Sequence, residues 1–190
     1  MFMESSIIIW LQSFESDFLD YFFITVSHIS SWVGAIVLFI FITLVLDKRF
    51  GIYWLVTFIF GLIINYYIKI IVSRPRPFEV FFEIKNKLPT IGYSFPSGHA
   101  YSCTFMFFVI LLLIEFFYKS NAQRRNKLLM YFAFIFGIFW ILLTALSRMY
   151  LGQHYISDIF GGIVVASISF FISNLVYHKH FASKNNYQKD

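Results

Sequence analysis

Long apolar runs alternate with short polar segments along most of the chain. Four of these runs come close to the roughly 20 residues that an α-helix needs to cross the hydrocarbon core of a bilayer. They occupy residues 52–72, 97–118, 128–146 and 159–177. The pattern therefore predicts membrane-spanning helices joined by polar turns, within a single domain that covers residues 1–190.

The N-terminal part has a less regular pattern. Residues 18–46 are long enough to span a bilayer, but polar residues interrupt their first half; these are Asp20, His28, Ser30 and Ser31. We interpret residues 1–28 as an interfacial segment that leads into a span over residues 29–46. The predicted fold is therefore all-α: an integral membrane helical bundle with about five transmembrane spans plus an interfacial N-terminal helix.

The composition supports lipid as the solvent of this chain, because 59% of the residues are hydrophobic, only 13% are charged and the mean hydropathy is +0.72. The lone Cys103 lies inside an apolar run, which excludes a disulfide within the chain and a metal site built on cysteines. The net charge of +5 does not indicate nucleic acid, because the basic residues fall in separate loops and form no continuous stripe.

Counting Lys and Arg residues predicts the orientation in the membrane. Nine of the 15 fall on one face, namely Lys48, Arg49, Lys119, Arg124, Arg125, Lys127, Lys179, Lys184 and Lys189. The other six fall on the opposite face, namely Lys69, Arg74, Arg76, Lys85, Lys87 and Arg148. Cytoplasmic loops carry the excess of positive charge, so the second face, and the polar segments on it, are expected outside the cell (inner) membrane. The basic tail, residues 178–190, is expected in the cytoplasm.

The polar stretch from Ser147 to Asp158 carries the strongest chemical signal. His154 and Asp158 are four residues apart, so at a helix start they share a face and the carboxylate can orient one imidazole nitrogen. Arg148 lies six residues before His154, on the wrong side of a continuous helix, so the chain must bend between them. Gly152 is the expected bend.

The predicted topology gathers cations, imidazoles and a helix start at one membrane surface. The expected group consists of Lys69, Arg76, Arg148, His99, His154, Asp158 and the turn Ser97-Gly98. Such a set favours a phosphoryl ligand, because guanidinium groups bind phosphate oxygens bidentately and a helix N-terminus offers free amides. Pro96 favours an extended residue before it and Ser97 as the N-cap.

Different partners predict different roles for the two histidines. His154, oriented by Asp158, is the expected nucleophile that attacks phosphorus, and His99 is the expected acid that protonates the departing oxygen and then activates water. The cations stabilise the phosphoryl oxygens. This scheme needs no metal and no cofactor, and we expect neither.

Three motifs carry a resemblance to a known family. Lys69 is followed by six residues and Arg76-Pro77; then come Pro96-Ser97-Gly98-His99; then Ser147-Arg148, five residues, His154, three residues and Asp158. This order resembles the signature of the type 2 phosphatidic acid phosphatase family, which shares its core with vanadium haloperoxidases. The resemblance covers residues 69–158 and implies a haloperoxidase-like core. It implies phosphate binding by Lys69, Arg76, Ser97, Gly98 and Arg148, with His99 as acid, His154 as nucleophile and Asp158 as its orienter. The membrane members of that family usually have six spans, against the five predicted here.

Simpler interpretations of single residues stand beside this one. Lys69 taken alone is a lysine that reaches from a helix end to the interface, Arg74 and Arg76 are solvated loop charges, and His99 is a neighbour of a helix cap. At the level of the whole chain, the expected enzyme hydrolyses a lipid phosphate or diphosphate: isoprenyl diphosphate, phosphatidylglycerol phosphate, phosphatidate or a lipid A phosphate. The alternatives are a non-catalytic phospholipid-binding or scrambling protein and a haloperoxidase.

Overall fold

The computed structural model describes residues 2–120 and 127–179, and every regular element within those ranges is helical. The elements are α1 (Phe2–Gln12), α2 (Asp17–Ile29), α3 (Trp32–Phe41), the π-helical turn η1 (Ile42–Leu46), α4 (Lys48–Val72), α5 (Pro77–Val80), α6 (Gly98–Ser120), α7 (Lys127–Tyr150) and α8 (Ile156–Tyr177). The predicted basic tail lies outside the described residues, apart from its first two, and so do Arg124 and Arg125.

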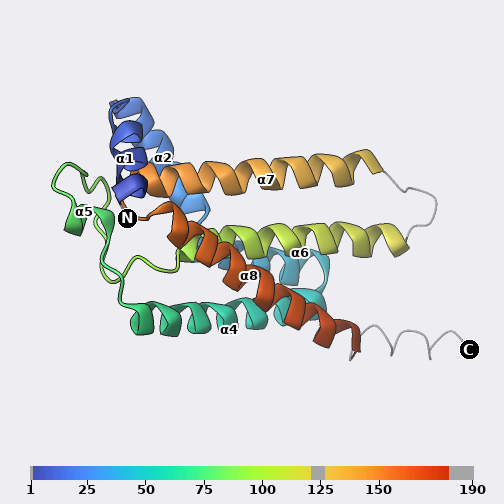
Figure 1. Cartoon of the computed structure of the whole chain (residues 1–190). Helices are drawn as coiled ribbons and strands as arrows, with labels where there is room; N and C mark the ends of the chain where they lie inside the picture. The colour runs from blue at the N-terminus through green and yellow to red at the C-terminus, as the bar shows by residue number, and fades with distance from the viewer. Residues whose placement is uncertain (1, 121–126, 180–190) are drawn as a thin grey trace, which may run out of the picture.

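Four of these helices, α4, α6, α7 and α8, are long and apolar enough to cross a membrane (Figure 1). A fifth candidate span is the pair formed by α2 and by α3 with η1, which is bent by 50° where the helices meet at Ser30 and Ser31. The all-α membrane bundle of about five spans is therefore confirmed. The N-terminal segment differs from a single interfacial helix, because it contains α1 and the whole of α2, separated by residues 13–16.

Short polar side chains at the helix starts explain where these elements begin. The Ser16 hydroxyl accepts the Leu19 amide at the start of α2, and the Ser31 hydroxyl accepts the Gly34 amide at the start of α3. Asp47 caps α4 by accepting the Phe50 amide at 2.7 Å. The Ser30-Ser31 pair thus ends one helix and caps the next, which is why the chain bends there.

Aromatic side chains form the centre of the bundle. Trp54, Phe58, Tyr101, Phe105 and Phe170 are between 0% and 6% exposed and join α4, α6 and α8. Many apolar side chains elsewhere on the spans are exposed instead, as expected for helices that face lipid. The α6–α8 crossing is close at its outer end, because a Cβ atom on Gly162 would lie 2.4 Å from the Ser97 carbonyl oxygen.

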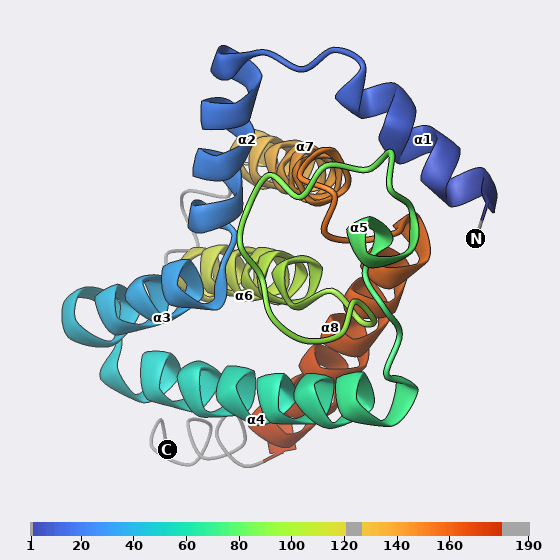
Figure 2. The ribbon, with the colours of Figure 1, turned by 90° about the vertical axis from the view of Figure 1, so that its left-hand side faces the viewer.

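The C-terminal ends of α4 and α7 and the N-terminal ends of α6 and α8 lie at the same end of the bundle, together with α1, α2 and the loop that contains α5 (Figures 1 and 2). The acidic N-terminal segment holds the loop in place: Lys87 pairs with Glu15 at 3.0 Å and with Asp20 at 2.9 Å, and Lys85 also pairs with Glu15. These ion pairs therefore hold the loop over this end of the bundle, which we call the closed end.

Candidate active site

The structure places all eight predicted site residues at this closed end. Lys69 is in the last turn of α4, Arg76 immediately precedes α5, Arg148 is in the last turn of α7, and Ser97, Gly98 and His99 form the start of α6. His154 lies in the loop between α7 and α8, and Asp158 is in the first turn of α8. His154 interacts electrostatically with Arg148, Arg76 and Lys69, and His99 with Arg148, His154 and Arg76. We call this group of eight the cationic site.

The His154 side chain is 3% exposed, and its Nδ1 lies 3.6 Å from Asp158 Oδ2, just beyond hydrogen-bond distance. Oδ2 accepts the Tyr155 amide at 2.8 Å, which fixes the carboxylate at the start of α8. Burial holds the pKa of His154 well below its usual value, and the nearby Arg148, Arg76 and Lys69 lower it further. The imidazole is therefore neutral at pH 7, the state that a nucleophile requires.

Lys69 and Arg76 bind the carbonyl oxygens of the loop before α6. Lys69 Nζ donates to the carbonyls of Tyr93 at 2.7 Å and Ser94 at 3.2 Å. Arg76 Nε donates to the Gly92 carbonyl at 2.7 Å, and its Nη1 donates to the Gln153 carbonyl at 3.1 Å. Both cations thus position the loop that leads into the Ser97-Gly98-His99 turn.

Arg148 is the most deeply buried of the three cations, at 1% exposure. Its Nη1 donates to the Ser27 hydroxyl of α2, whereas its Nε has no hydrogen-bond partner among the described residues. A buried guanidinium group with an unused donor costs free energy unless an anion binds it. This donor is therefore available to a negatively charged ligand.

The turn at the start of α6 has the predicted N-cap. Ser97 Oγ accepts the Ala100 amide at 3.4 Å, and the Ser97 amide donates to the Asp158 carbonyl at 2.9 Å. The second bond ties the start of α6 to the first turn of α8, so the amides of one helix start and the carboxylate of the other are held together. The positive end of the α6 dipole lies at this point.

Comparison with known protein families identifies the family of this chain. A family model described as the PAP2 superfamily matches residues 50–183, more than half of the chain. The chain belongs to the PAP2 superfamily. Membership makes it a relative of membrane lipid phosphatases, in agreement with the resemblance of its three motifs, which we call the PAP2 signature.

Two PAP2 relatives come from Bacillus subtilis (strain 168). Undecaprenyl-diphosphatase BcrC is 32% identical over 127 residues, which cover 66% of this chain and 57% of that protein. Phosphatidylglycerophosphatase B is 27% identical over 122 residues, which cover 64% of this chain and 55% of that protein. The match thus spans little more than half the length of either relative.

Two solved PAP2 structures are similar in fold. The first is a transmembrane PAP2-type phosphatidylglycerolphosphate phosphatase from Bacillus subtilis, with a TM-score of 0.73, 20% identity and coverage of 94% of this chain and 86% of that one. The second is Aquifex aeolicus LpxE, with a TM-score of 0.69, 19% identity and coverage of 88% and 92%. At these identities the likeness establishes the fold, an integral membrane helical bundle.

Arg74, outside the PAP2 signature as we define it, is bound to the cationic site, and the simpler interpretation of it as a solvated loop charge is wrong. Its Nη1 donates to Asp158 Oδ1 at 2.7 Å and to Ser157 Oγ at 2.6 Å, and its Nη2 pairs with Glu4 Oε2 at 3.1 Å. The guanidinium carbon lies 4.0 Å from the centre of the Tyr155 ring. Arg74 therefore supports the carboxylate beside His154. The only sequence signal was the repeated Arg-Pro of residues 74–77.

Glu4 of α1 is the second residue that sequence reasoning missed. Its carboxylate accepts the Ser157 amide at 2.9 Å, in the first turn of α8, in addition to pairing with Arg74. Burial opposes ionisation here, but the hydrogen bonds from Ser157 and Arg74 keep the pKa of Glu4 below its ordinary value. No local pattern connects residue 4 with residues 74 and 157, so only the folded chain reveals this contact.

The predicted bend at Gly152 is present and is held by two buried glutamines. Gly152 has φ +74°. Gln153 Oε1 accepts Arg76 Nη1, and its Nε2 donates to Asn86 Oδ1 at 2.7 Å. Gln12 of α1 binds the carbonyls of Lys85 and Tyr150 at 2.9 and 2.8 Å. These contacts fix the segment that carries His154.

The described residues, 2–120 and 127–179, contain no group of three or more His, Cys, Asp or Glu side chains arranged to hold a metal ion.

Proposed function

We propose that this chain hydrolyses the terminal phosphate of a lipid phosphate or diphosphate through a phosphohistidine intermediate on His154. The observation that carries the proposal is the convergence of three cations and two imidazoles on one site, in which the buried Arg148 Nε has no partner among the described residues. Membership of the PAP2 superfamily and similarity to two lipid phosphatases support the same reaction.

In the first step, a ring nitrogen of His154 attacks phosphorus in line with the bond to the leaving oxygen. The new P–N bond forms as the P–O bond breaks, and His99 gives its proton to the departing lipid alkoxide or lipid phosphate. Asp158 stabilises the positive charge that develops on the His154 ring. In the second step, His99 removes a proton from water, the water oxygen attacks phosphorus, and inorganic phosphate leaves His154.

Lys69, Arg76, Arg148, the Ser97 hydroxyl and the Gly98 amide bind the three equatorial oxygens in both steps. Because charge on these oxygens is distributed throughout the transfer, fixed cations stabilise the transition state without reorganisation. Removing one such donor is expected to slow the reaction by about a hundred- to a thousandfold. The excess of Lys and Arg on the other face supports a position of the site at the extracytoplasmic surface of the cell (inner) membrane.

Phosphate release by purified protein in detergent tests the proposal. The substrates are isoprenyl diphosphate, phosphatidylglycerol phosphate and phosphatidate, each assayed with and without a chelator. We expect release that the chelator leaves unchanged, its loss in His154→Ala, and wild-type rates in His178→Ala, which alters an exposed histidine at the opposite end of α8. Undiminished activity in His154→Ala rules out this nucleophile. Lipid binding or scrambling that survives in His154→Ala, with no phosphate release by the wild type, favours the non-catalytic alternative.

A further inference from the structure

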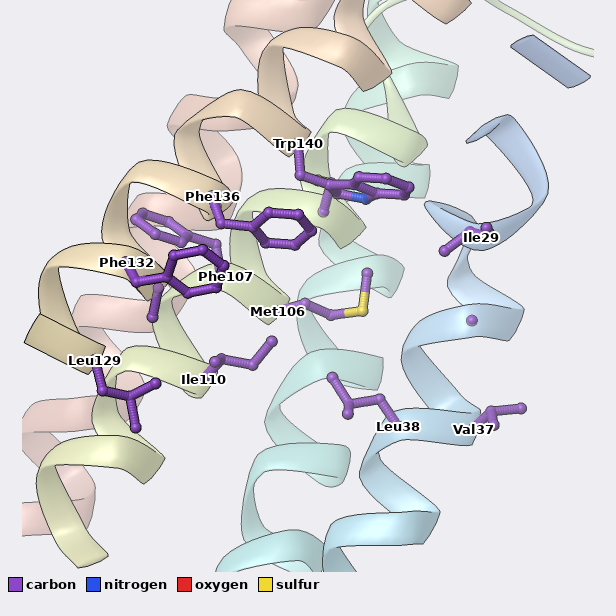
Figure 3. Close-up of a pocket in the computed structure, with 14 residues that line it drawn as sticks. Ile29, Val37, Leu38, Met106, Phe107, Ile110, Leu129, Phe132, Phe136 and Trp140 are labelled. Carbon is purple, nitrogen blue, oxygen red and sulfur yellow. The ribbon is translucent and has the colours of Figure 1, made fainter. Parts of the chain in front are cut away.

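An apolar groove of about 750 Å³ lies in the membrane-spanning part of the bundle, between the cationic site and the opposite end of the bundle. One wall comes from α7, the other from α3, and α6 forms its floor (Figure 3). The largest side chains on the walls are Phe132, Phe136 and Trp140 of α7 and Leu38 of α3, with Met106 of α6 between them. A lining of this kind suits a hydrocarbon ligand.

The bend between α2 and α3 creates this groove. α2 packs on α7 at the outer end of the bundle, but the 50° bend at Ser30 and Ser31 carries α3 away from α7 and onto α4 and α6 (Figure 2). Side chains along both rims remain exposed: Val37 by 62%, Phe132 by 64% and Phe136 by 51%. The groove therefore opens sideways, toward the acyl chains of the bilayer, between α3 and α7.

One end of the groove lies close to the cationic site. Ser30 and Thr144 are both buried and hydrogen-bonded to each other at 2.7 Å, and the Thr144 hydroxyl lies 3.6 Å from Cys103 Sγ, which lines the groove. Thr144 is four residues before Arg148 on α7, and Cys103 is four residues after His99 on α6. On α6, one helical turn, about 6 Å, thus separates the groove from His99, and on α7 about 12 Å, or two turns, separate the lining residue Trp140 from Arg148.

The other end of the groove lies far from the cationic site. The lining extends along α7 from Trp140 to Leu129. Leu129 is 19 residues before Arg148, which in an α-helix is a distance of about 28 Å. One leaflet contributes only about 15 Å to a hydrocarbon core of about 30 Å. A chain that starts at the cationic site and fills the groove therefore continues past the middle of the bilayer.

We propose that this groove binds the single long hydrocarbon chain of a polyisoprenyl phosphate or diphosphate whose phosphate occupies the cationic site. The proposal rests on the proposed function and narrows its substrate class. A diacyl lipid ends within one leaflet and has two chains, whereas the groove lining extends along α7 from Trp140 to Leu129 and so reaches past the middle of the bilayer. The bilayer delivers the chain through the lateral opening between α3 and α7, and the headgroup binds in the neighbouring cationic site.

Substitutions that fill the groove test the proposal. Val37→Trp and Ala133→Trp place an indole on opposite walls, and the matched control Val56→Trp alters a 60% exposed position on α4 that lies outside the groove. The measured quantity is the ratio of kcat/KM for a long-chain polyprenyl diphosphate to that for geranyl diphosphate. We expect this ratio to fall at least about tenfold in each groove variant, the effect of excluding roughly two buried methylene groups, and to stay unchanged in the control. An unchanged ratio in both groove variants overturns the proposal.

A binding measurement separates failure of this proposal from failure of the proposed function. A photoreactive polyprenyl phosphate is cross-linked to the His154→Ala variant, and the labelled peptides are identified by mass spectrometry. Labelling within residues 29–38 and 129–140 supports the groove whether or not the wild type releases phosphate. Labelling confined to other helices, or labelling of these peptides that excess phosphatidate displaces as well as excess polyprenyl phosphate does, overturns it.

Discussion

Replacement of Arg74 by Ala tests whether the carboxylate beside His154 depends on a guanidinium group that the PAP2 signature does not include. The Asp158 side chain is fully buried, and its oxygens accept a hydrogen bond from Arg74 at 2.7 Å and another from the Tyr155 amide at 2.8 Å. A hydrogen bond to a charged group is worth about 1.5 to 3 kcal/mol. The Glu4 pair is partly exposed and adds less than about 1 kcal/mol.

We therefore expect Arg74→Ala to lower kcat about 10- to 100-fold, which corresponds to about 1.4 to 2.7 kcal/mol in the barrier. Phosphate release by wild type, Arg74→Ala and the control Arg49→Ala, an exposed position at the start of α4, measures this effect. If Arg74 acts through Asp158, Arg74→Ala costs much less in an Asp158→Asn background than in the wild type. Full additivity of the two substitutions, or wild-type kcat in Arg74→Ala with unchanged thermal unfolding, would refute the reasoning.

Three further outcomes follow from the same structure. Gly152→Ala is expected to reduce both thermal stability and kcat, because Gly152 has φ +74° and a Cβ would lie 2.4 Å from the Lys85 carbonyl oxygen. The control is Gly92→Ala, which has φ +83° and open space around it and so measures only the backbone cost of about 1 to 2 kcal/mol. Equal losses of stability in the two variants would contradict the clash at Gly152. Gln12→Ala is expected to lower the free energy of unfolding by about 1 to 3 kcal/mol, because buried backbone groups of Lys85 and Tyr150 lose their hydrogen-bond partner. Unchanged thermal unfolding would show that Gln12 does not stabilise this part of the fold. His154→Asn is expected to weaken the pH dependence of stability. Because the pKa of His154 is depressed in the folded protein, the unfolded chain binds an extra proton below about pH 6.5, so acid destabilises the wild type more than the variant. Thermal unfolding at pH 7.5 and 5.5 measures this difference, and equal acid sensitivity of the two proteins would contradict it.

Local signals were sufficient for much of the site. The Ser97 N-cap and the bend at Gly152 were predicted from single residue types, and both are present. The spans were predicted from apolar runs, although Arg148 belongs to the last turn of α7 and not to the loop that follows it. These features depend on backbone conformation and hydropathy over a few neighbouring residues, which a sequence displays directly.

Contacts between distant segments were not predictable in this way. Arg74 was interpreted as a loop charge, because its partners Glu4 and Asp158 are 70 and 84 residues away. Gln12 showed no signal at all, although it binds the backbone at Lys85 and Tyr150. The sequence does not distinguish a polar side chain of a short N-terminal helix that is exposed to solvent from one that is buried. Only the folded chain shows which backbone groups such a side chain contacts.

Sequence alone was enough to predict a helical membrane protein with a cationic phosphate site, because hydropathy and the order of the three motifs do not depend on how the helices pack. The tertiary structure decided what surrounds that site. It brings α1 over the start of α8, so that Glu4 and Arg74 support Asp158. It also turns α3 away from α7 and leaves an apolar groove beneath Arg148. Both depend on the angles between helices, which are set by packing among residues far apart in the chain.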